Sequence, residues 1–473
     1  MILHFALLVV GIFAPLGLGW LLFAQLYPVP LRRDVRIIAS FLVGKSILTI
    51  TLFIAALFGL PLGWGQCVTV LLILYAILAA LCKRPHVTHP EPLCHALETH
   101  SRPSRLITAA ILGWLLAYGL CILGIAMSEP IGCRPGIAIW GFKAKLIFLD
   151  QALPLQYLAN PDLTFMQPRY PLGEPLFMAW LYQWMGAVDD YSITMLPPLY
   201  AGMACVGLYG ILRQEGVARP LCAALTLLMA SGQQFYSCAI QFYMEIPLLL
   251  HALFGAYFLN CFARNADMRA CWMGSLFLAA GAWVKQEGVV IVAAAFIPVV
   301  LTAWRLQRGL VLRATGAMIA PVLLFIVPWQ WIVWRSGATY SDFFFSRTMI
   351  TSPDRVQKIS DMIATDFYRA LVGMPTTHAG AWLLLAVVCV IRCKRFLATR
   401  GIQMLLLMLP PIVITYAVVF FFSTLDIRWH LMAAYRILLP PSVIALLAAG
   451  MLCARDDNSV ESVSSVPQDS ERS

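Results

Sequence analysis

The chain has 473 residues, of which 61% are hydrophobic and 12% charged, with a formal net charge of +10 and a mean hydropathy of +0.80. A water-soluble fold cannot hide so much apolar surface, whereas a bilayer accepts helical spans of about 20 apolar residues. The alternating ten-residue segments of an outer-membrane barrel are absent from the sequence, and so is a basic stripe interleaved with aromatic residues. We therefore expect an all-α polytopic membrane protein without a nucleic-acid partner.

Apolar segments of membrane-spanning length recur from the N-terminus to about residue 453. The first begins MILHFALLVV, with no basic n-region and no small-residue cleavage site, and we expect it to be a retained span. Hydropathy predicts about 13 transmembrane helices. They cover residues 2–26, 37–60, 65–82, 106–127, 192–212, 221–239, 246–263, 270–284, 288–304, 314–334, 378–394, 402–423 and 437–453.

The basic residues between these segments predict the orientation, because short cytoplasmic loops are enriched in Lys and Arg. Alternate connections are basic, for example around Arg213, Arg264 and Arg305, and they share one side if the C-terminus is cytoplasmic. This arrangement requires that residues 172–187 do not cross the membrane. We expect that segment to form an interfacial helix, since its aromatic residues suit the lipid headgroups.

Three regions follow from this topology. Residues 1–105 contribute the first helices and a cytoplasmic loop, residues 106–454 contain the long outer connections, and the polar tail 455–473 is expected to be disordered and cytoplasmic. The expected outer connections are 128–191, 335–377 and 424–436.

The outer loop 128–191 is the longest polar connection in this apolar chain. Apolar residues recur at helical spacing from 137 to 148, which predicts an interfacial helix with Trp140 among the headgroups. Prolines in the following stretch, FMQPRYPLGEP, prevent a continuous helix and predict a shaped loop just above the bilayer.

Charged side chains in this loop are candidates for contact with a phosphorylated lipid headgroup. Arg169 can bind a phosphate with both arms of its guanidinium, and Lys143 and Lys145 would add positive charge. Glu129 and Glu174 can accept a proton. The alternative is that these charges only solvate the loop and extend from the interface into water.

Two outer turns place charges next to spans. Glu245, in QFYMEIP, precedes Pro247 at the mouth of a span, where a carboxylate is either functional or caps the helix. Lys285, in WVKQEG, interrupts a long apolar run together with Glu287. This pair either lines a cavity or simply forms the turn between two short spans.

The last outer connection, DIRWHLMAAYRILLPP, carries His430 and Arg436. An arginine at the start of a span can clamp a lipid phosphate. His430 can titrate near neutral pH, although a lone loop histidine is more often structural. No spacing of cysteine or histidine in the chain predicts a metal site.

In their order along the chain, these features resemble the GT-C superfamily of integral-membrane glycosyltransferases, near the bacterial relatives of the aminoarabinose and protein-mannose transferases. The resemblance covers roughly residues 106–445. It lies in five motifs that are weak singly and moderately specific together: IWGFKAKLIF, QPRYPLGEP, YMEIP, VKQEG, and WHL followed by Arg436.

The resemblance implies a transferase that moves a sugar, with inversion, from a polyprenyl-phosphate-linked donor to an extracytoplasmic glycan, lipid or protein. Residues 106–454 would be its catalytic region, in a bacterial inner membrane with the site facing the periplasm or cell exterior. Arg436, Arg169 and Lys143 would bind the carrier phosphate, while Trp140 and Tyr170 would line the sugar or lipid pocket. The lipid-linked sugar would be the donor, and the sequence requires no divalent metal or other cofactor.

The sequence departs from the family pattern at two positions. Many relatives carry an aspartate where Pro135 stands, and some carry one where Arg169 stands. Glu129 is the acid nearest the expected catalytic base and is the first choice for that role, with Glu245 second. The departure also leaves open a catalytically altered chain or a non-catalytic scaffold.

Two other kinds of membrane protein fit the composition. A polysaccharide polymerase or ligase also uses lipid-linked sugars, but its major loop tends to come late in the chain. A lipid or solute transporter would carry charges near the membrane midplane and repeat-related broken helices. The sequence has no evident repeat, and Lys45 is the main charge inside an apolar segment.

Overall fold

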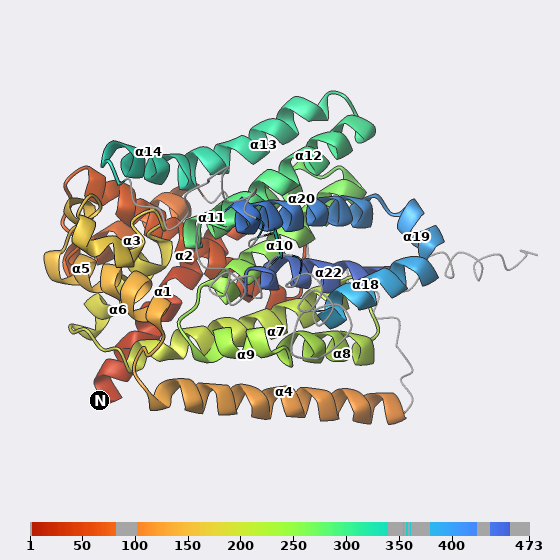
Figure 1. The fold of residues 1–473 in the computed structure, drawn as a ribbon, viewed down its shortest axis with the longest axis horizontal. Coiled ribbons are helices and arrows are strands. Elements are labelled where there is room, and N and C mark those ends of the chain that lie inside the picture. Colours follow the sequence, from red (N-terminus) through yellow and green to blue (C-terminus); the bar gives the residue numbers. More distant parts are fainter. Residues whose placement is uncertain are drawn as a thin grey trace, which may run out of the picture.

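The computed structural model of the chain is a bundle of helices that run roughly side by side (Figure 1). It describes residues 2–81, 102–338, 379–422 and 436–454, with the isolated residues 353, 356, 357 and 360. The secondary structure of these residues is helical, without a β-strand. The predicted all-α class is confirmed for this part of the chain.

Each apolar segment that hydropathy singles out forms one helix or a pair of helices. The first four are α1 (Ile2–Leu26), α2 (Arg33–Leu57), α3 (Trp64–Leu81) and α4 (Arg102–Ser128). The central ones are α7 (Leu196–Gln214), α8 (Arg219–Ala230), α9 (Gln233–Ile240), α10 (Glu245–Asn265), α11 (Met268–Val284), α12 (Gly288–Leu306), α13 (Leu310–Phe325) and α14 (Val327–Arg335). The last described helices are α18 (Ala379–Ile391), α19 (Cys393–Ala398), α20 (Arg400–Phe422) and α22 (Leu439–Leu452).

Many of these helices are long and apolar enough to cross a membrane. The described ranges contain seven such helices, and an eighth if the bent pair α13 and α14 is one span. The seven are α1, α2, α3, α4, α7 with the short helix η4 (Ser192–Met195), α10 and α12. The chain therefore has the architecture of a polytopic membrane protein.

Two predicted spans are broken. Residues 314–334 bend by 43° between α13 and α14, where Pro328 lies in the first turn of α14 and has no backbone N–H to continue a helix. Residues 221–239 separate into α8 and α9 at Gly232, whose backbone is extended. Hydropathy cannot locate either break, because apolar residues continue through both.

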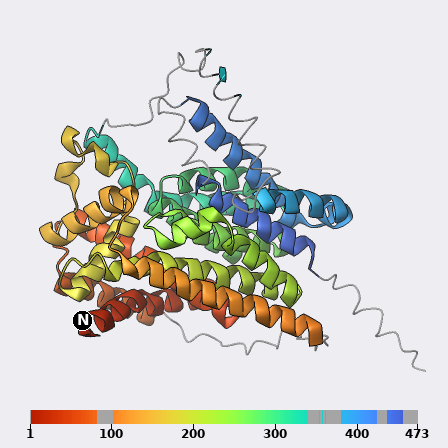
Figure 2. The same cartoon turned by 60° about the horizontal axis from the view of Figure 1, so that its bottom comes forward.

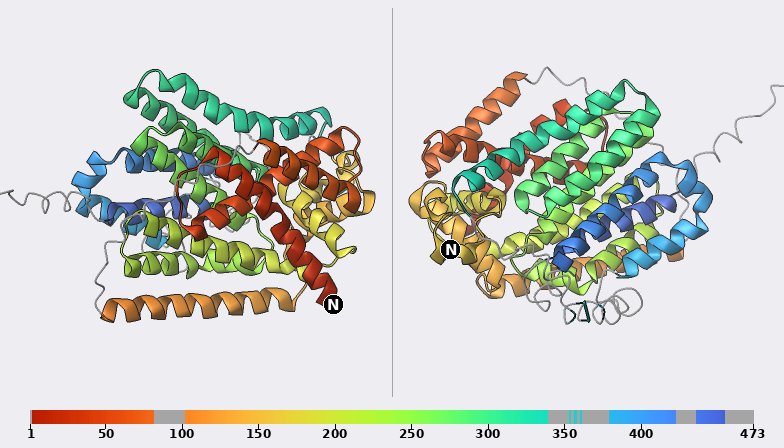
Figure 3. Two further views of the ribbon diagram at one scale, coloured as in Figure 1. Left: turned by 180° about the vertical axis from the view of Figure 1, so that it is seen from behind. Right: turned by 45° about the horizontal axis from the view of Figure 1, so that its top comes forward.

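The helix α10 forms the centre of the bundle. Its whole apolar window is buried, and it packs against α7, α11, α12, α20 and α22. Phe258 of α10 stacks on Phe277 of α11 with ring centroids 5.6 Å apart. At the other extreme, α4 lies along the outside of the bundle, beside α7, α8 and α9 (Figures 2 and 3).

The loop 128–191 folds into short helices at one end of the bundle (Figure 1). They are the π-helix η1 (Gly136–Gly141), α5 (Phe142–Asp150), the 3₁₀ turns η2 (Leu155–Tyr157) and η3 (Pro161–Met166), and α6 (Gly173–Met185).

The helix α6 occupies the place of the predicted interfacial helix at 172–187 but is enclosed by protein. Trp180 and Tyr182 are buried. The Trp180 indole donates a hydrogen bond to the Gly11 carbonyl of α1 at 2.8 Å, and the Tyr182 hydroxyl donates to Asp190 at 3.1 Å. Placing these aromatic residues among headgroups was wrong, because a protein surface with polar acceptors satisfies the same side chains.

Several basic connections meet at the other end of the bundle. Arg264, in the last turn of α10, pairs with Glu215 just after α7. Arg395 of α19 donates a hydrogen bond to the Ala454 carbonyl beyond α22. Figure 1 places α19 at the end farthest from α5 and α6. These two contacts belong to connections that the sequence predicts to be basic and cytoplasmic, and the orientation itself stays a prediction.

The helices α1 and α2 touch backbone to backbone at two glycines. A Cβ atom on Gly19 would lie 1.7 Å from the Ser40 carbonyl oxygen, and one on Gly44 would lie 1.9 Å from the Pro15 carbonyl oxygen. Glycine allows such an approach between membrane helices because it has no side chain. The contact fixes α2 against α1.

Replacing Gly44 by alanine should separate these helices. We expect Gly44→Ala to lower the free energy of unfolding by about 1–3 kcal/mol, as overpacking of a tight contact does, measured by denaturant or thermal unfolding in micelles. Gly113→Ala in α4 is the matched control, since no atom lies within 4 Å of the added Cβ. Equal stabilities of the two variants would contradict a tight α1–α2 contact.

Candidate functional site

A cluster of charges lies where α10, the α11–α12 turn and the start of the last helix meet. The Lys285 ammonium lies 3.0 Å from Glu245 Oε1 and 2.9 Å from Glu287 Oε1. All three side chains are largely buried, with exposed fractions of 9%, 3% and 16% for Lys285, Glu245 and Glu287. A lysine so enclosed is stable only because both carboxylates offset its desolvation.

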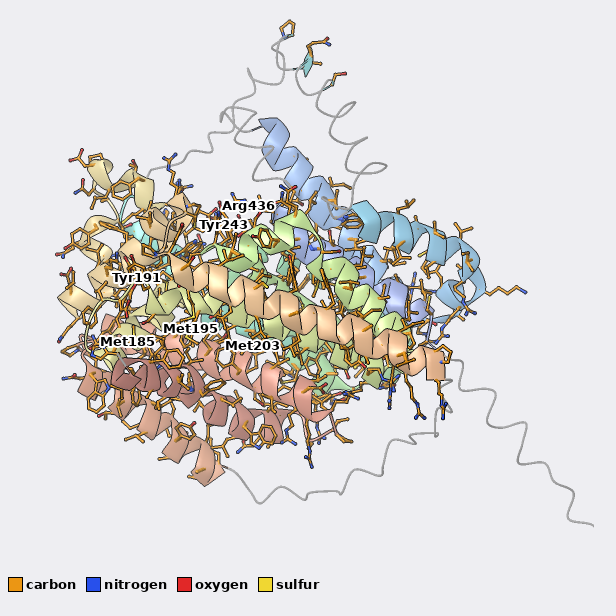
Figure 4. The ribbon with its side chains drawn as sticks, turned by 90° about the horizontal axis from the view of Figure 1, so that it is seen from below. Met185, Tyr191, Met195, Met203, Tyr243 and Arg436 are labelled. Carbon is orange, nitrogen blue, oxygen red and sulfur yellow. The ribbon has the colours of Figure 1, made fainter. Side chains whose placement is uncertain are left out.

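Arg436 joins this cluster from the other side of Glu245. Its Nη1 lies 3.6 Å from Glu245 Oε1, and its guanidinium carbon lies 4.1 Å from the ring centroid of Tyr243 (Figure 4). The aromatic face attracts the cation and holds it in this direction. One lysine and one arginine thus flank the Glu245 carboxylate.

Two tyrosines close the cluster around Glu287. The Tyr170 hydroxyl donates a hydrogen bond to Glu287 Oε1 at 3.3 Å, and the Tyr416 hydroxyl of α20 donates to the Glu287 backbone carbonyl at 3.2 Å. Tyr170 also packs edge-on against Trp140, with centroids 5.4 Å apart. The outer loop 128–191 therefore reaches the charges on α10 and the α11–α12 turn.

Helix ends position these groups. Glu245 is the first residue of α10, and Arg436 lies shortly before α22. Lys285 has extended backbone directly after α11, and the turn closes with a hydrogen bond from the Gly288 amide to the Lys285 carbonyl at 2.9 Å. A Cβ on Gly288 would lie 2.5 Å from the Ala282 nitrogen, so only glycine fits this turn.

The electrostatics of the cluster favour its charged forms. Burial alone would lower the pKa of Lys285, but the neighbouring Glu245 and Glu287 carboxylates outweigh it and raise the pKa above the usual lysine range. Burial likewise opposes the charge of Arg436, and Glu245 reverses that effect and raises its pKa. Two cations and two carboxylates leave the cluster close to neutral overall.

Each carboxylate keeps one oxygen without a partner. Glu245 Oε2 and Glu287 Oε2 are buried and have no hydrogen bond to any residue that the structure describes. Buried acceptors are almost always satisfied in native proteins, and exceptions call for an explanation. These two oxygens are the atoms of the cluster that can still accept a proton or a hydrogen bond from a ligand.

Lys143 does not present its charge to a ligand. It is fully buried, and its amine donates hydrogen bonds to the backbone carbonyls of Gln167 at 2.8 Å and Tyr170 at 2.9 Å. Burial lowers the pKa of Lys143 to about 7. The side chain fastens the loop that carries Tyr170 to α5, so the expected contact with phosphate is replaced by a structural one.

Glu174 lies in a second buried group, away from the outer surface where the loop sequence placed it. It pairs with Lys45 of α2, and the Tyr200 hydroxyl of α7 donates a hydrogen bond to Glu174 Oε2 at 3.0 Å. The Lys45 amine also lies 3.2 Å from the Tyr200 hydroxyl. Lys45, the charge inside an apolar segment, is therefore paired with an acidic residue of α6.

The remaining candidates are scattered. Glu129 is exposed after α4, without a hydrogen bond or ion pair to another described residue. Lys145 pairs with Asp190 at 2.5 Å. Trp140 is buried, so its expected place among headgroups is wrong. His430 lies outside the described residues.

Arg169 is exposed beside the cluster. Its Nη2 lies 3.5 Å from the Ala338 carbonyl oxygen, and its own carbonyl accepts a hydrogen bond from the Trp329 indole at 2.9 Å. Because the next residue is Tyr170, Arg169 lies near the Glu287 side of the cluster. The structure thus brings together Glu245, Lys285, Arg436 and the Arg169–Tyr170 loop.

Sequence reasoning missed several members of these groups. Glu287, in the same motif as Lys285, and Tyr243, in the motif YMEIP, each had a signal in the sequence, whereas Tyr416 had none. Tyr200 and His251 look like ordinary residues of apolar helices. Among the described residues no three His, Cys, Asp or Glu side chains gather in a way that would hold a metal ion.

No protein-family model, no curated protein and no solved structure matches this chain. The chemistry of the cluster is therefore inferred from its geometry and from the motifs that contribute to it.

Lys143 should make stability depend on pH. Between about pH 7 and the usual lysine pKa, the unfolded chain binds a proton at Lys143 that the folded chain does not bind, so stability rises with pH. We expect the wild type to gain about 2 kcal/mol relative to Lys143→Met between pH 7 and pH 9, measured by unfolding in micelles.

The control for this experiment is Lys145→Met, on the same helix but partly exposed and paired with Asp190. A constant stability difference between the wild type and Lys143→Met over that pH range would refute the low pKa of the buried amine.

Proposed function

We propose that the protein is a membrane glycosyltransferase that takes a sugar from a polyprenyl-phosphate-linked donor and gives it, with inversion, to a glycan, lipid or protein. The donor is soluble only in the bilayer, so an enzyme that uses it needs spans, and its phosphate lies at the interface. In this proposal the end of the bundle that carries the loop 128–191 faces the periplasm or cell exterior of a bacterial inner membrane.

One observation carries the proposal. The motifs QPRYPLGEP, YMEIP and VKQEG and the residue Arg436 lie far apart in the sequence, yet Tyr170, Glu245, Lys285 and Arg436 form one connected cluster. Charges next to membrane spans are costly and are retained mainly for function. Residues from several of the motifs behind the resemblance are therefore in one cluster, which supports the proposal.

The cluster can supply the parts of an inverting transfer. The acceptor hydroxyl oxygen would attack the anomeric carbon as the bond from that carbon to the phosphate oxygen breaks. Glu245 would take the hydroxyl proton as general base, because two cations keep it ionised and its Oε2 has no hydrogen-bond partner among the described residues. Arg436 and the exposed Arg169 would stabilise the departing phosphate.

Glu245 replaces Glu129 as the first choice for the base. Glu129 is exposed and has no neighbour among the described residues that would tune or orient it, whereas Glu245 is held by Lys285 and lies beside Arg436. A base must be fixed within hydrogen-bond reach of the proton that it removes.

The two carboxylates can be compared directly. With a panel of polyprenyl-phosphate monosaccharides and envelope lipid extract as acceptor, we expect Glu245→Gln to slow release of polyprenyl phosphate by about 10²–10⁴-fold and Glu129→Gln to remain close to the wild type. Thermal unfolding of each purified variant separates lost chemistry from lost folding. Full activity of a folded Glu245→Gln protein would remove Glu245 from the mechanism.

A lipid or solute transporter is the second candidate, and one observation favours it. Lys45 and His251 lie buried inside spanning helices, and Lys45 is paired with Glu174. Buried ionisable groups of this kind also occur along the ion and substrate pathways of transporters.

Reconstitution into liposomes distinguishes the two functions. For a transferase we expect no movement of a fluorescent polyprenyl phosphate between leaflets above that in protein-free liposomes, measured by quenching from outside. Flux that disappears in a folded Lys45→Met/Glu174→Leu double variant, in which no buried charge is left unpaired, would instead identify a transporter.

A further inference from the structure

We propose that Lys45, Ser46 and Thr49 of α2 are positioning residues for the charge cluster, although none of them touches it. Each one contacts a different helix that contains a cluster residue or directly adjoins the segment that carries one. The inference concerns the placement of Tyr170, Glu245 and Lys285, and it holds whichever reaction the cluster serves.

The three residues form one polar face on an otherwise apolar helix. At 100° per residue, positions 45, 46 and 49 fall within about a third of the helix circumference. All three side chains are buried, with exposed fractions of 2% or less. In such a setting a polar side chain depends on other parts of the protein for its hydrogen bonds.

Lys45 holds the start of α6. Its partner Glu174 follows Tyr170 by four residues, in the first turn of α6, and Tyr200 bonds to both Lys45 and Glu174. The preceding residue, Gly173, packs so closely on α11 that a Cβ there would lie 2.5 Å from the Trp283 carbonyl oxygen. Fixing Glu174 therefore fixes the end of the loop that delivers Tyr170 to Glu287.

Ser46 contacts the helix that begins with Glu245. Its hydroxyl oxygen lies 3.3 Å from Nε2 of His251. The other ring nitrogen, Nδ1, lies 2.7 Å from the Pro247 carbonyl oxygen, which can only accept, so Nδ1 carries a proton. The imidazole thus connects α2 to the first turn of α10.

Thr49 holds the end of α11. The Trp283 indole donates a hydrogen bond to Thr49 Oγ1 at 3.1 Å, and Lys285 follows two residues later. Trp283 is 1% exposed and packs edge-on against Phe53 of α2 with centroids 5.1 Å apart. The indole direction, and with it the turn that carries Lys285 and Glu287, is set by α2.

Thr49 provides the sharpest test, because its hydroxyl and its methyl group can be removed separately. Thr49→Val keeps the shape and deletes the acceptor for Trp283, whereas Thr49→Ser keeps the acceptor and deletes the methyl group. The readout is amide hydrogen exchange of residues 283–289 in the full chain in nanodiscs, where turn hydrogen bonds protect the amides of Lys285 and Gly288.

We expect Thr49→Val to speed exchange in 283–289 at least about fivefold relative to the rest of the bundle, and Thr49→Ser to stay near the wild type. Thr226→Val and Thr226→Ser are the matched controls, because the buried Thr226 hydroxyl bonds only within its own helix, to Cys222. Equal exchange in the two Thr49 variants, or a larger effect of Thr49→Ser, would show that Thr49 acts through packing and would overturn the proposal.

The ion pair is tested with both partners replaced, since a single change leaves a buried charge unpaired. Apolar residues of similar volume often preserve stability in such a double replacement. We expect Lys45→Met with Glu174→Leu to fold and to exchange faster at residues 167–173, again by about fivefold. A folded double variant with wild-type exchange in that segment would contradict a positioning role for Lys45.

Discussion

The Lys285 ammonium lies within 3.0 Å of two carboxylates in a region that is largely closed to water, and the order of the surrounding segments depends on this contact. Removing charges from water costs several kcal/mol per ion, and only closely placed opposite charges and hydrogen bonds offset that cost. Glu245 and Glu287 must therefore stay where they are for Lys285 to remain charged. Tyr170 and Arg436 join them, so one cation determines how an outer loop, two helix starts and a turn are arranged.

The apolar surroundings explain why polar contacts in this protein come in connected groups. Inside a bundle of spanning helices, the partners of a hydroxyl, an imidazole or an amine come from neighbouring helices. The helix α2 has three such contacts on one face, made by Lys45, Ser46 and Thr49. It packs against α1 through the contact at Gly44. The charge cluster at the helix ends and the polar group on α2 are then linked through the helices between them, and the residues on α2 can be replaced without changing a residue of the cluster.

The sequence predicted the helical segments well, because each is apolar over a length that only a membrane or a buried core explains. It also identified Glu245, Lys285 and Arg436, since charges beside spans are rare. It could not reveal that Glu174 turns inward to Lys45, because the pairing joins residues 129 positions apart. Nor could it separate Trp180 and Tyr182 in contact with protein from the same residues in contact with headgroups. The break at Gly232 was not predicted either, because apolar composition does not show where the backbone leaves the helical conformation.

The hydrogen bond between Arg169 and α14 links the position of this arginine to the orientation of the helix. The backbone carbonyl of this arginine is held by Trp329, just past Pro328, and its guanidinium reaches Ala338 beyond the end of the same helix. The backbone of Arg169 is thus attached to a short helix set at an angle to its predecessor, and its side chain contacts the residues that follow this helix. A tilt of that helix would therefore shift the backbone of Arg169, so the position of this exposed cation depends on the bend before α14 as well as on its own rotamer.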